Sequence, residues 1–356
     1  MREWLDREVV GDPSRMHGDA IAARVAVEEA REQVAALVDA RASEIVFTSG
    51  ATEATAMLAY GAAVSRGAHT VLAPVEHSAV RRWAERGPSS MGVVDALGRI
   101  DPAELASLIR SDTGLVQCQW ANHEVGTIQP VARAVELARE ACASTGSRAV
   151  VASDAAIAVG HVPVSFRTSG LDAMAVSGHK FGGPPGSGAL IIRRGVRLEP
   201  LLVGGDQERA RRGGMESVID IVGFGAAAAD AQRTLDDGRH HARMLTDRVV
   251  SWARHADGVS VLGDADDRVD HLVCLAVDGL EPQALVLGLD AVGIAVHSGS
   301  SCSSEALEPS PVLEAMGVDA HRSLRISVTS TTTADDIAAF CRATDQVIRS
   351  LRALRT

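Results

Sequence analysis

The sequence predicts an α/β protein with a large domain over residues 12–235, built on a mostly parallel sheet, and a smaller α+β domain over residues 236–356. In the first part, short apolar runs alternate with amphipathic helical stretches, which is typical of a parallel sheet covered on both faces. After residue 235 a charged helical stretch leads to fewer strand-like runs. The length of 356 residues suits two domains. Residues 1–11 could pack on the smaller domain.

The apolar pattern gives the order of elements in the large domain. Strands are expected at 44–48, 70–74, 92–96, 115–120, 149–153, 173–176 and 189–193. Helices are expected at 20–38, from 53 through 60, from 101 onwards and at 131–141. The helix near residue 101 has an aspartate at its N-cap, a proline at its first position and a glutamate at its third.

The smaller domain is expected to mix a few strands with helices. Strands are predicted at 259–262, 271–277 and 324–328. Helices are predicted at 236–252, 283–289, 311–316 and 335–354.

The composition argues against several classes of protein. Hydrophobic residues make up 46% and charged residues 23%, as in soluble globular proteins. The net charge of −11, without a basic block, argues against direct binding of nucleic acid. No apolar run reaches membrane-spanning length, and residues 1–10 lack the core of a signal peptide. We therefore expect a cytoplasmic protein with no membrane contact.

The five cysteines are odd in number and lack metal-type spacing, which favours reduced thiols and predicts no metal site. Cys118 and Cys274 lie in apolar strand-like runs, and Cys341 lies on the apolar stripe of the last helix, so all three are expected to be small buried hydrophobes. Cys302 differs because it lies in the polar, small-residue run 297–304, which is typical of a loop. An exposed thiol in such a loop is more often reactive than structural.

The stretch 171–188 carries the strongest chemical signal. An apolar strand at 173–176 stops at Ser177, and His179 and Lys180 follow before a cluster of glycines and prolines that must turn sharply. A lysine held there can be desolvated, which lowers its pKa and makes it a nucleophile for aldehydes. The neighbouring hydroxyl, imidazole and backbone N–H groups suit an anion. Together these features meet the needs of pyridoxal phosphate (PLP), although the motif alone also fits a lysine on an ordinary loop.

Other polar residues follow the predicted strands. Residues 49–53 join a strand to a helix start, which offers N–H groups to a phosphate, although an ordinary helix cap explains the same residues. Glu76-His77, residues 122–124 and Asp154 lie at strand ends, where ligands collect in parallel sheets. A buried carboxylate at Asp154 could keep a pyridine nitrogen protonated, and His77 could stack on the ring.

Taken in order, these motifs resemble the cysteine desulfurases of the NifS/IscS type, within the class V aminotransferase family of fold-type I PLP-dependent enzymes. The resemblance extends over nearly the whole chain from residue 12. It rests on Phe47-Thr48-Ser49-Gly50-Ala51-Thr52-Glu53, Glu76-His77, Asn122-x-Glu124-Val125-Gly126-Thr127-Ile128-Gln129-Pro130, Ser177-Gly178-His179-Lys180, Gly204-Gly205 with Glu208-Arg209, Ser298 through Ser304 continuing to Ser310, and Leu324-Arg325-Ile326-Ser327.

The resemblance implies roles for the matching residues. Lys180 would form the Schiff base with PLP and move protons at the substrate α-carbon. Cys302 would be the nucleophile that takes sulfur from L-cysteine as a persulfide and releases alanine. Arg325 would bind the substrate carboxylate. The family also implies a homodimer and a sulfur-acceptor protein, for example in iron–sulfur cluster assembly.

The remaining roles that the resemblance implies concern the cofactor. His77 would stack on PLP and act in proton transfer, and Asp154 would pair with its pyridine nitrogen. The phosphate and the rest of the cofactor would be held by Ala51, Thr52, Ser177 and His179. His123 would contact both the cofactor and the substrate.

Four features depart from the family pattern: the opening strand with the pattern Asp-x-Ala-x-Thr-Thr is missing from this sequence, and three single positions differ. His123 replaces an asparagine, Ile157 replaces a glutamine, and Met215 replaces the threonine that reaches the partner's phosphate. Each removes or alters one hydrogen bond to cofactor or substrate. Two alternatives therefore stay open: another class V enzyme, such as a selenocysteine lyase, a C–S lyase or an aminotransferase, and a weakened PLP-fold protein that acts as a sulfur-transfer or assembly partner.

Overall fold

The computed structural model describes residues 1–7, 10–298 and 309–354. The chain divides into two compact units. Unit 1 consists of Met1–Gly92, Asp101–Trp120 and Pro130–Leu235, and unit 2 consists of Val93–Ile100, Ala121–Gln129 and Asp236–Thr356. The sequence analysis also placed a boundary at residue 235, but it kept 93–100 and 121–129 in the large domain and associated residues 1–11 with the small one. In the structure, the described residues of that N-terminal segment group with unit 1.

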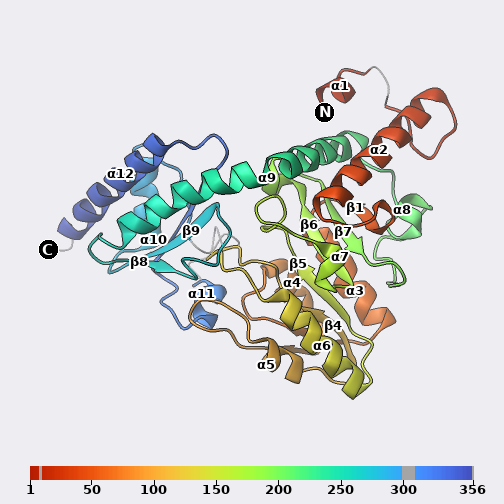
Figure 1. Ribbon diagram of the computed structural model, residues 1–356, viewed down its shortest axis with the longest axis horizontal. Coiled ribbons are helices and arrows are strands. Elements are labelled where there is room, and N and C mark those ends of the chain that lie inside the picture. Colours follow the sequence, from red (N-terminus) through yellow and green to blue (C-terminus); the bar gives the residue numbers. More distant parts are fainter. Residues whose placement is uncertain (8–9, 299–308, 355–356) are drawn as a thin grey trace. The chain divides into compact units, whose positions relative to one another are not determined.

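A seven-stranded sheet forms the centre of unit 1 (Figure 1). Its strands are β1 (Ile45–Thr48), β2 (His69–Leu72), β3 (Ser89–Met91), β4 (Thr113–Gln117), β5 (Val150–Asp154), β6 (Ala173–Ser177) and β7 (Gly188–Ile192). Their spatial order is β1-β7-β6-β5-β4-β2-β3, and only β7 pairs antiparallel with its neighbours. The predicted mostly parallel α/β sheet is therefore confirmed.

Helices surround this sheet. They are α1 (Arg2–Leu5), α2 (Gly18–Leu37), α3 (Ala51–Ser65), α4 (Ser78–Ala84), α5 (Pro102–Ser107), α6 (Val131–Thr145), α7 (Phe166–Ser169), α8 (Gln207–Ala210) and the first part of α9 (Val218–Ala253), with 3-10 turns η1 (Ala42–Glu44) and η2 (Gly178–Phe181). Helix α3 packs across β1, β4, β5, β6 and β7. Its buried side chains, Ala54, Met57 and Leu58, join Leu190 and Ile192 of β7 in one apolar cluster. This packing places the start of α3 close to the carboxyl end of β6.

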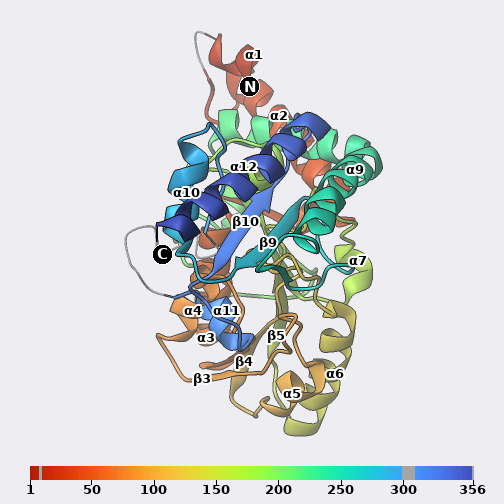
Figure 2. The ribbon, with the colours of Figure 1, turned by 90° about the vertical axis from the view of Figure 1, so that its left-hand side faces the viewer.

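Unit 2 contains a three-stranded antiparallel sheet in the order β10-β9-β8, formed by Ser323–Ser327, Leu272–Val277 and Val259–Leu262. Its helices are the second part of α9, α10 (Pro282–Asp290), α11 (Pro311–Ala315) and α12 (Ala334–Ala353), and Figure 2 shows α12 across β9 and β10. One apolar core joins α9, β9, β10 and α12, with Leu245, Leu275, Leu324 and Phe340 at its centre. Among the described helices, none combines the length and apolarity that a membrane span needs.

Two sequence predictions of elements are wrong. The strand expected at 92–96 lies instead at 89–91. Residues 95–99 form a turn, because the Asp95 carboxylate accepts hydrogen bonds from the backbone N–H groups of Leu97 and Arg99 and Gly98 has a φ of +74°. The helix expected at 236–252 begins at Val218. The alanine-rich run before residue 236 favours this longer helix.

Candidate active site

Lys180 lies on a turn directly after a buried strand. β6 is buried along its whole length, and η2 follows it. Gly178 allows the turn to lie against the sheet, because a Cβ there would approach Ser187 Oγ to 2.5 Å and Phe224 Cδ2 to 2.8 Å. The backbone carbonyl of Lys180 accepts a hydrogen bond from His161 Nε2 at 2.8 Å. The backbone of Lys180 is therefore fixed by its surroundings.

The expectation of a desolvated lysine is wrong in this structure, because Lys180 and the preceding His179 are both exposed. The turn begins after the last residue of the strand, so its side chains emerge beyond the buried layer. Lys180 is also the only lysine among the 356 residues. It is therefore the only side-chain primary amine in the chain that could react with a carbonyl group.

Asp154 and His77 lie at strand ends of the same sheet. Asp154 is the last residue of β5, opposite Ala175 of β6, and its Oδ1 accepts a hydrogen bond from Ala156 N at 2.9 Å. His77 follows β2 and caps α4, with its Nδ1 accepting a hydrogen bond from Ala79 N at 3.1 Å. A neutral imidazole that accepts at Nδ1 carries its proton on Nε2.

His77, Asp154 and Lys180 act on one another electrostatically, and we call them the lysine cluster. Burial lowers the pKa of His77 and the charge of Lys180 lowers it further, whereas Asp154 opposes both effects. Burial raises the pKa of Asp154, and the charges of His77 and Lys180 oppose that shift. The structure thus brings together the three residues that the sequence analysis chose on separate grounds.

Glu76 is a fourth group of this site, to which the sequence analysis gave no role. It is 1% exposed, and its Oε1 accepts a hydrogen bond from Gln119 N at 2.6 Å. Its Oε2 is buried without a hydrogen-bond partner among the described residues. Burial, and then the nearby charge of Asp154, raise the pKa of Glu76 to about 8. Near neutral pH Glu76 is therefore protonated, which leaves one fewer negative charge beside Asp154.

A cradle for an anion lies beside the lysine cluster. The first hydrogen bond within α3 runs from Ala54 N to Gly50 O, so the N–H groups of Ala51 and Thr52 have no acceptor within the helix. Ser177 is next to this helix start, because a Cβ on Gly50 would lie 3.8 Å from Ser177 Oγ. Ser177 Oγ also contacts His179 Nδ1 at 3.0 Å. Helix N–H groups, a hydroxyl and an imidazole together suit a phosphate.

Unit 2 holds the predicted substrate residues around the loop 121–129. Asn122 Oδ1 accepts hydrogen bonds from the backbone N–H groups of Glu124 and Val125, which closes a tight turn. Glu124 is 4% exposed and accepts a hydrogen bond from Ser310 Oγ at 2.5 Å. These contacts fix the backbone on either side of His123.

Arg325 on β10 contacts this loop. Its Nη1 donates a hydrogen bond to the backbone carbonyl of His123 at 3.0 Å, and His123 Nε2 lies 3.6 Å from Glu124 Oε1. We call His123, Glu124 and Arg325 the Arg325 cluster. It can present a guanidinium and an imidazole to an acidic ligand. The third predicted catalytic residue, Cys302, lies outside the described residues.

Two of the positions that depart from the family pattern are in unit 1. Ile157 is partly buried, and Met215 is 53% exposed. The cysteines expected to be structural match that role: Cys118 and Cys274 are buried, and burial raises the pKa of Cys274 to about 12. Cys341 is partly buried, and burial raises its pKa to about 11.

The chain belongs to the aminotransferase class-V family, whose model matches residues 5–340. It is 35% identical to "Cysteine desulfurase IscS" of Methanosarcina thermophila, over 97% of this chain and 87% of the relative. It is 39% identical to "Cysteine desulfurase" of Cereibacter sphaeroides, over 98% and 91%. A solved "NifS-like protein" superposes with a TM-score of 0.88 at 30% identity, over 96% of this chain and 93% of that one. The resemblance inferred from the motifs is confirmed.

Proposed function

We propose that the protein is a cysteine desulfurase that uses PLP to convert L-cysteine to L-alanine and keeps the sulfur atom as a persulfide on Cys302. The observation that carries this proposal is the lysine cluster. The only lysine of the chain acts electrostatically on the Asp154 carboxyl at the end of β5 and on His77, whose imidazole caps α4, in a member of the class V family.

The residues of unit 1 fit PLP. Lys180 would hold the aldehyde carbon, the start of α3 with Thr52, Ser177 and His179 would hold the phosphate, and Asp154 would face the pyridine nitrogen. Burial raises the pKa of Asp154, and a pyridinium bound opposite would favour its charged form.

When bound, PLP supplies an electron sink for negative charge that develops at the substrate α-carbon. Lys180 Nζ would take the α-proton and return it, and its exposed position leaves it room to reach a substrate. His77 would donate its Nε2 proton nearby. Arg325 would bind the substrate carboxylate, for which a planar guanidinium is well suited.

Cys302 would act as the nucleophile toward the substrate sulfur. Its thiolate forms an S–S bond as the Cβ–S bond of cysteine breaks, and the electron pair of the broken bond remains on the carbon fragment. That carbon then takes up a proton and leaves as alanine. The balance is L-cysteine plus enzyme thiol giving L-alanine plus enzyme persulfide, and a thiol reductant releases the sulfur as sulfide.

The test starts from purified protein with added PLP. We expect a visible absorption band that L-cysteine changes, with alanine and sulfide produced when a reductant is present. Borohydride should fix PLP to the single lysine-containing peptide, and the N-terminal amine serves as the internal control. Cys302→Ser should keep the band and lose alanine formation. A protein that stays colourless with PLP would contradict the proposal and favour the assembly-partner alternative.

We further propose a cytoplasmic homodimer that passes sulfur to an acceptor protein, with iron–sulfur cluster assembly as the destination. The segment 202–215 supports the dimer, because Leu202, Val203 and Met215 are exposed at 40%, 80% and 53% and a second copy could cover them. Light scattering on purified protein should give twice the chain mass. A monomer at micromolar concentration would contradict the proposed homodimer.

The departures at His123, Ile157 and Met215 favour a second candidate, another class V enzyme acting on a related substrate. If Cys302→Ser keeps full turnover of L-cysteine while Lys180→Ala stops it, a C–S lyase or an aminotransferase explains the protein better. Turnover of selenocysteine but not cysteine would identify a selenocysteine lyase.

A further inference from the structure

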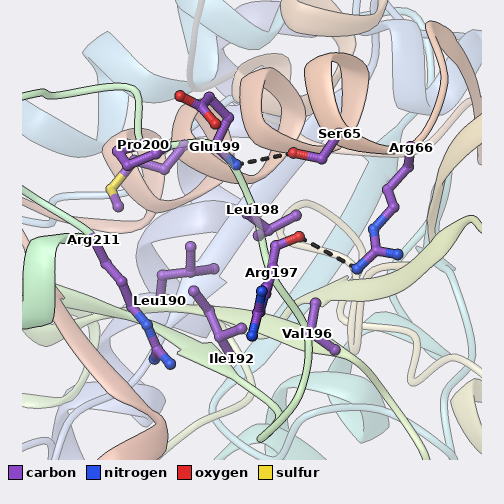
Figure 3. Close-up of a pocket in the computed structure, with 11 residues that line it drawn as sticks. Ser65, Arg66, Leu190, Ile192, Val196, Arg197, Leu198, Glu199, Pro200 and Arg211 are labelled. Atoms are coloured by element: carbon purple, nitrogen blue, oxygen red, sulfur yellow. Dashed lines mark hydrogen bonds between the residues drawn. The ribbon is translucent and has the colours of Figure 1, made fainter.

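A pocket of about 530 Å³ opens in unit 1, away from the lysine cluster (Figure 3). Leu190 and Ile192 of β7 contribute to its apolar lining. Ile192 pairs with Ala173 at the start of β6, whereas Lys180 follows the end of β6. Ser65, at the other end of α3 from Ala51, also lines the pocket, and 15 residues of helix span about 20 Å. The pocket and the lysine cluster are therefore separate sites.

The walls of the pocket are held together by specific contacts. Gly61 of α3 lets the segment 196–200 lie close, because a Cβ there would approach Glu199 O and Leu198 Cβ to 2.8 Å. Ser65 Oγ accepts a hydrogen bond from Glu199 N at 3.1 Å. Arg66 Nη2 donates to Arg197 O at 3.3 Å. These contacts form the pocket without help from a ligand.

Three arginines from separate segments line the pocket, and we call it the arginine pocket. Arg66 follows α3, Arg197 follows β7, and Arg211 follows α8; Figure 3 shows Arg66 and Arg211 on opposite sides with Arg197 between them. Glu199 is the only acidic residue in the lining. The lining thus has a net positive charge in a chain whose net charge is −11.

Two of these guanidinium groups have buried N–H groups without an acceptor. Arg66 Nε and Arg211 Nη1 are buried and make no hydrogen bond to any described residue. Leaving a buried, charged donor unsatisfied is unfavourable, and a bound anion would remove that cost. The C-terminus of α3 carries a partial negative charge that opposes an anion, but three guanidinium groups outweigh it.

A strained turn directs Arg211 into the pocket. Glu208, Arg209 and Ala210 have φ values of +48°, +59° and +60°, and three successive left-handed residues other than glycine are unusual. The turn is held by Glu208, which is 6% exposed and accepts two hydrogen bonds from Arg31 at 2.7 Å and one from Phe47 N at 2.8 Å. Strain that the surroundings enforce in this way is typical of functional sites.

From this geometry we propose that the arginine pocket is a second binding site, which takes a small molecule with a phosphate or carboxylate group on an apolar body. The anionic group binds guanidinium groups of the lining, and the apolar part covers Val196 and Leu198, which line the pocket and are partly exposed. The volume is within the roughly 300–1,000 Å³ of small-molecule sites. Burial and the charge of Arg209 lower the pKa of Arg211, and a bound anion would reverse that effect.

The test uses the full chain saturated with PLP, so that the cofactor's own phosphate cradle is occupied. Phenyl phosphate and benzoate are titrated calorimetrically at low salt, with inorganic phosphate for comparison. We expect both aromatic anions to bind about tenfold more tightly than inorganic phosphate, since only they use the apolar floor. Arg197→Met and Arg66→Met should each weaken binding about tenfold.

Arg133→Met is the matched control, because Arg133 lies in the same unit on α6, exposed and paired with Glu136. This variant should bind phenyl phosphate and benzoate with affinities within about twofold of those of the parent protein. Thermal melting checks that each variant is folded. The proposal is overturned if neither aromatic anion binds, as would happen if a second copy of the chain covered the pocket. It is also overturned if inorganic phosphate binds equally well, or if both arginine variants bind like the parent protein. Binding is measured without turnover, so the result is independent of the proposed reaction.

Discussion

The lysine cluster and the Arg325 cluster are built in different ways. In unit 1, Asp154 ends one strand and Lys180 lies on the turn after the next, and the charges of His77 and then Lys180 act on Asp154. In unit 2, His123 sits on a loop that side chains hold in place, through Asn122 and the Glu124–Ser310 contact. The first arrangement suits a permanently held cofactor. The second suits a substrate that comes and goes.

This difference separates the expected effects of substitutions. Changes in the lysine cluster should alter the amount of bound cofactor or the rate of chemistry. Changes in the Arg325 cluster should alter the concentration of L-cysteine needed and leave the cofactor band unchanged.

Lys180→Ala should have the largest effect. No other lysine can replace the amine, so the visible band should disappear and turnover should fall roughly 10³-fold or more. Absorbance and alanine formation measure the two losses. Arg193→Ala, which removes a cation at the far end of β7, is the control for charge. A normal band in Lys180→Ala would contradict the role of this residue.

Arg325→Gln should have the second-largest effect. Losing a charged hydrogen bond to the substrate carboxylate costs about 1.5–3 kcal/mol, so KM for L-cysteine should rise roughly tenfold to 100-fold. The cofactor band should not change, because Arg325 is assigned to the substrate. The control is Arg322→Gln on the same unit, where the side chain is 42% exposed and pairs with Asp278. Loss of the cofactor band with an unchanged KM would mean that Arg325 holds the cofactor and not the substrate.

Glu76→Gln tests the buried carboxyl beside the lysine cluster through the stability of the protein. In the folded protein the pKa of Glu76 is raised to about 8, while in the unfolded chain it lies near 4.3. Between these values the unfolded state releases a proton that the folded state keeps, so the parent protein loses stability as pH rises. Glutamine cannot ionise, so the Tm of the variant minus that of the parent should rise from pH 5 to pH 8 and then level off.

A buried amide with one unsatisfied N–H could lower the Tm of Glu76→Gln at every pH, but such an offset does not depend on pH. Glu140→Gln, at an exposed position on α6, removes the same type of group and should show no rise. A Tm difference for Glu76→Gln that is flat from pH 5 to pH 9 would mean that Glu76 is ionised in the folded protein.

The strand ends explain why so much of the site could be predicted from sequence. Asp154 and Lys180 follow apolar runs that end abruptly, and parallel strands bring such ends to one edge of a sheet. The state of Glu76 could not be predicted, because its raised pKa depends first on full burial and then on the charge of Asp154, 78 residues further on. The exposure of Lys180 was mispredicted for a similar reason, since it depends on where the turn leaves the sheet. The arginine pocket could not be predicted either, because its lining comes from three separate segments and no local sequence pattern marks it.

His123→Asn should have the smallest effect and sharpens the comparison within unit 2. The backbone carbonyl of His123 receives the hydrogen bond from Arg325, so this contact survives any change of side chain. Only the imidazole, 3.6 Å from Glu124 Oε1, is replaced. An asparagine restores the amide of the family pattern, and one regained hydrogen bond of about 1 kcal/mol should lower KM or the Kd for PLP about fivefold. If KM and the Kd for PLP stay the same or increase, the imidazole is suited to this protein's own substrate. The second candidate function, another class V enzyme, then gains support.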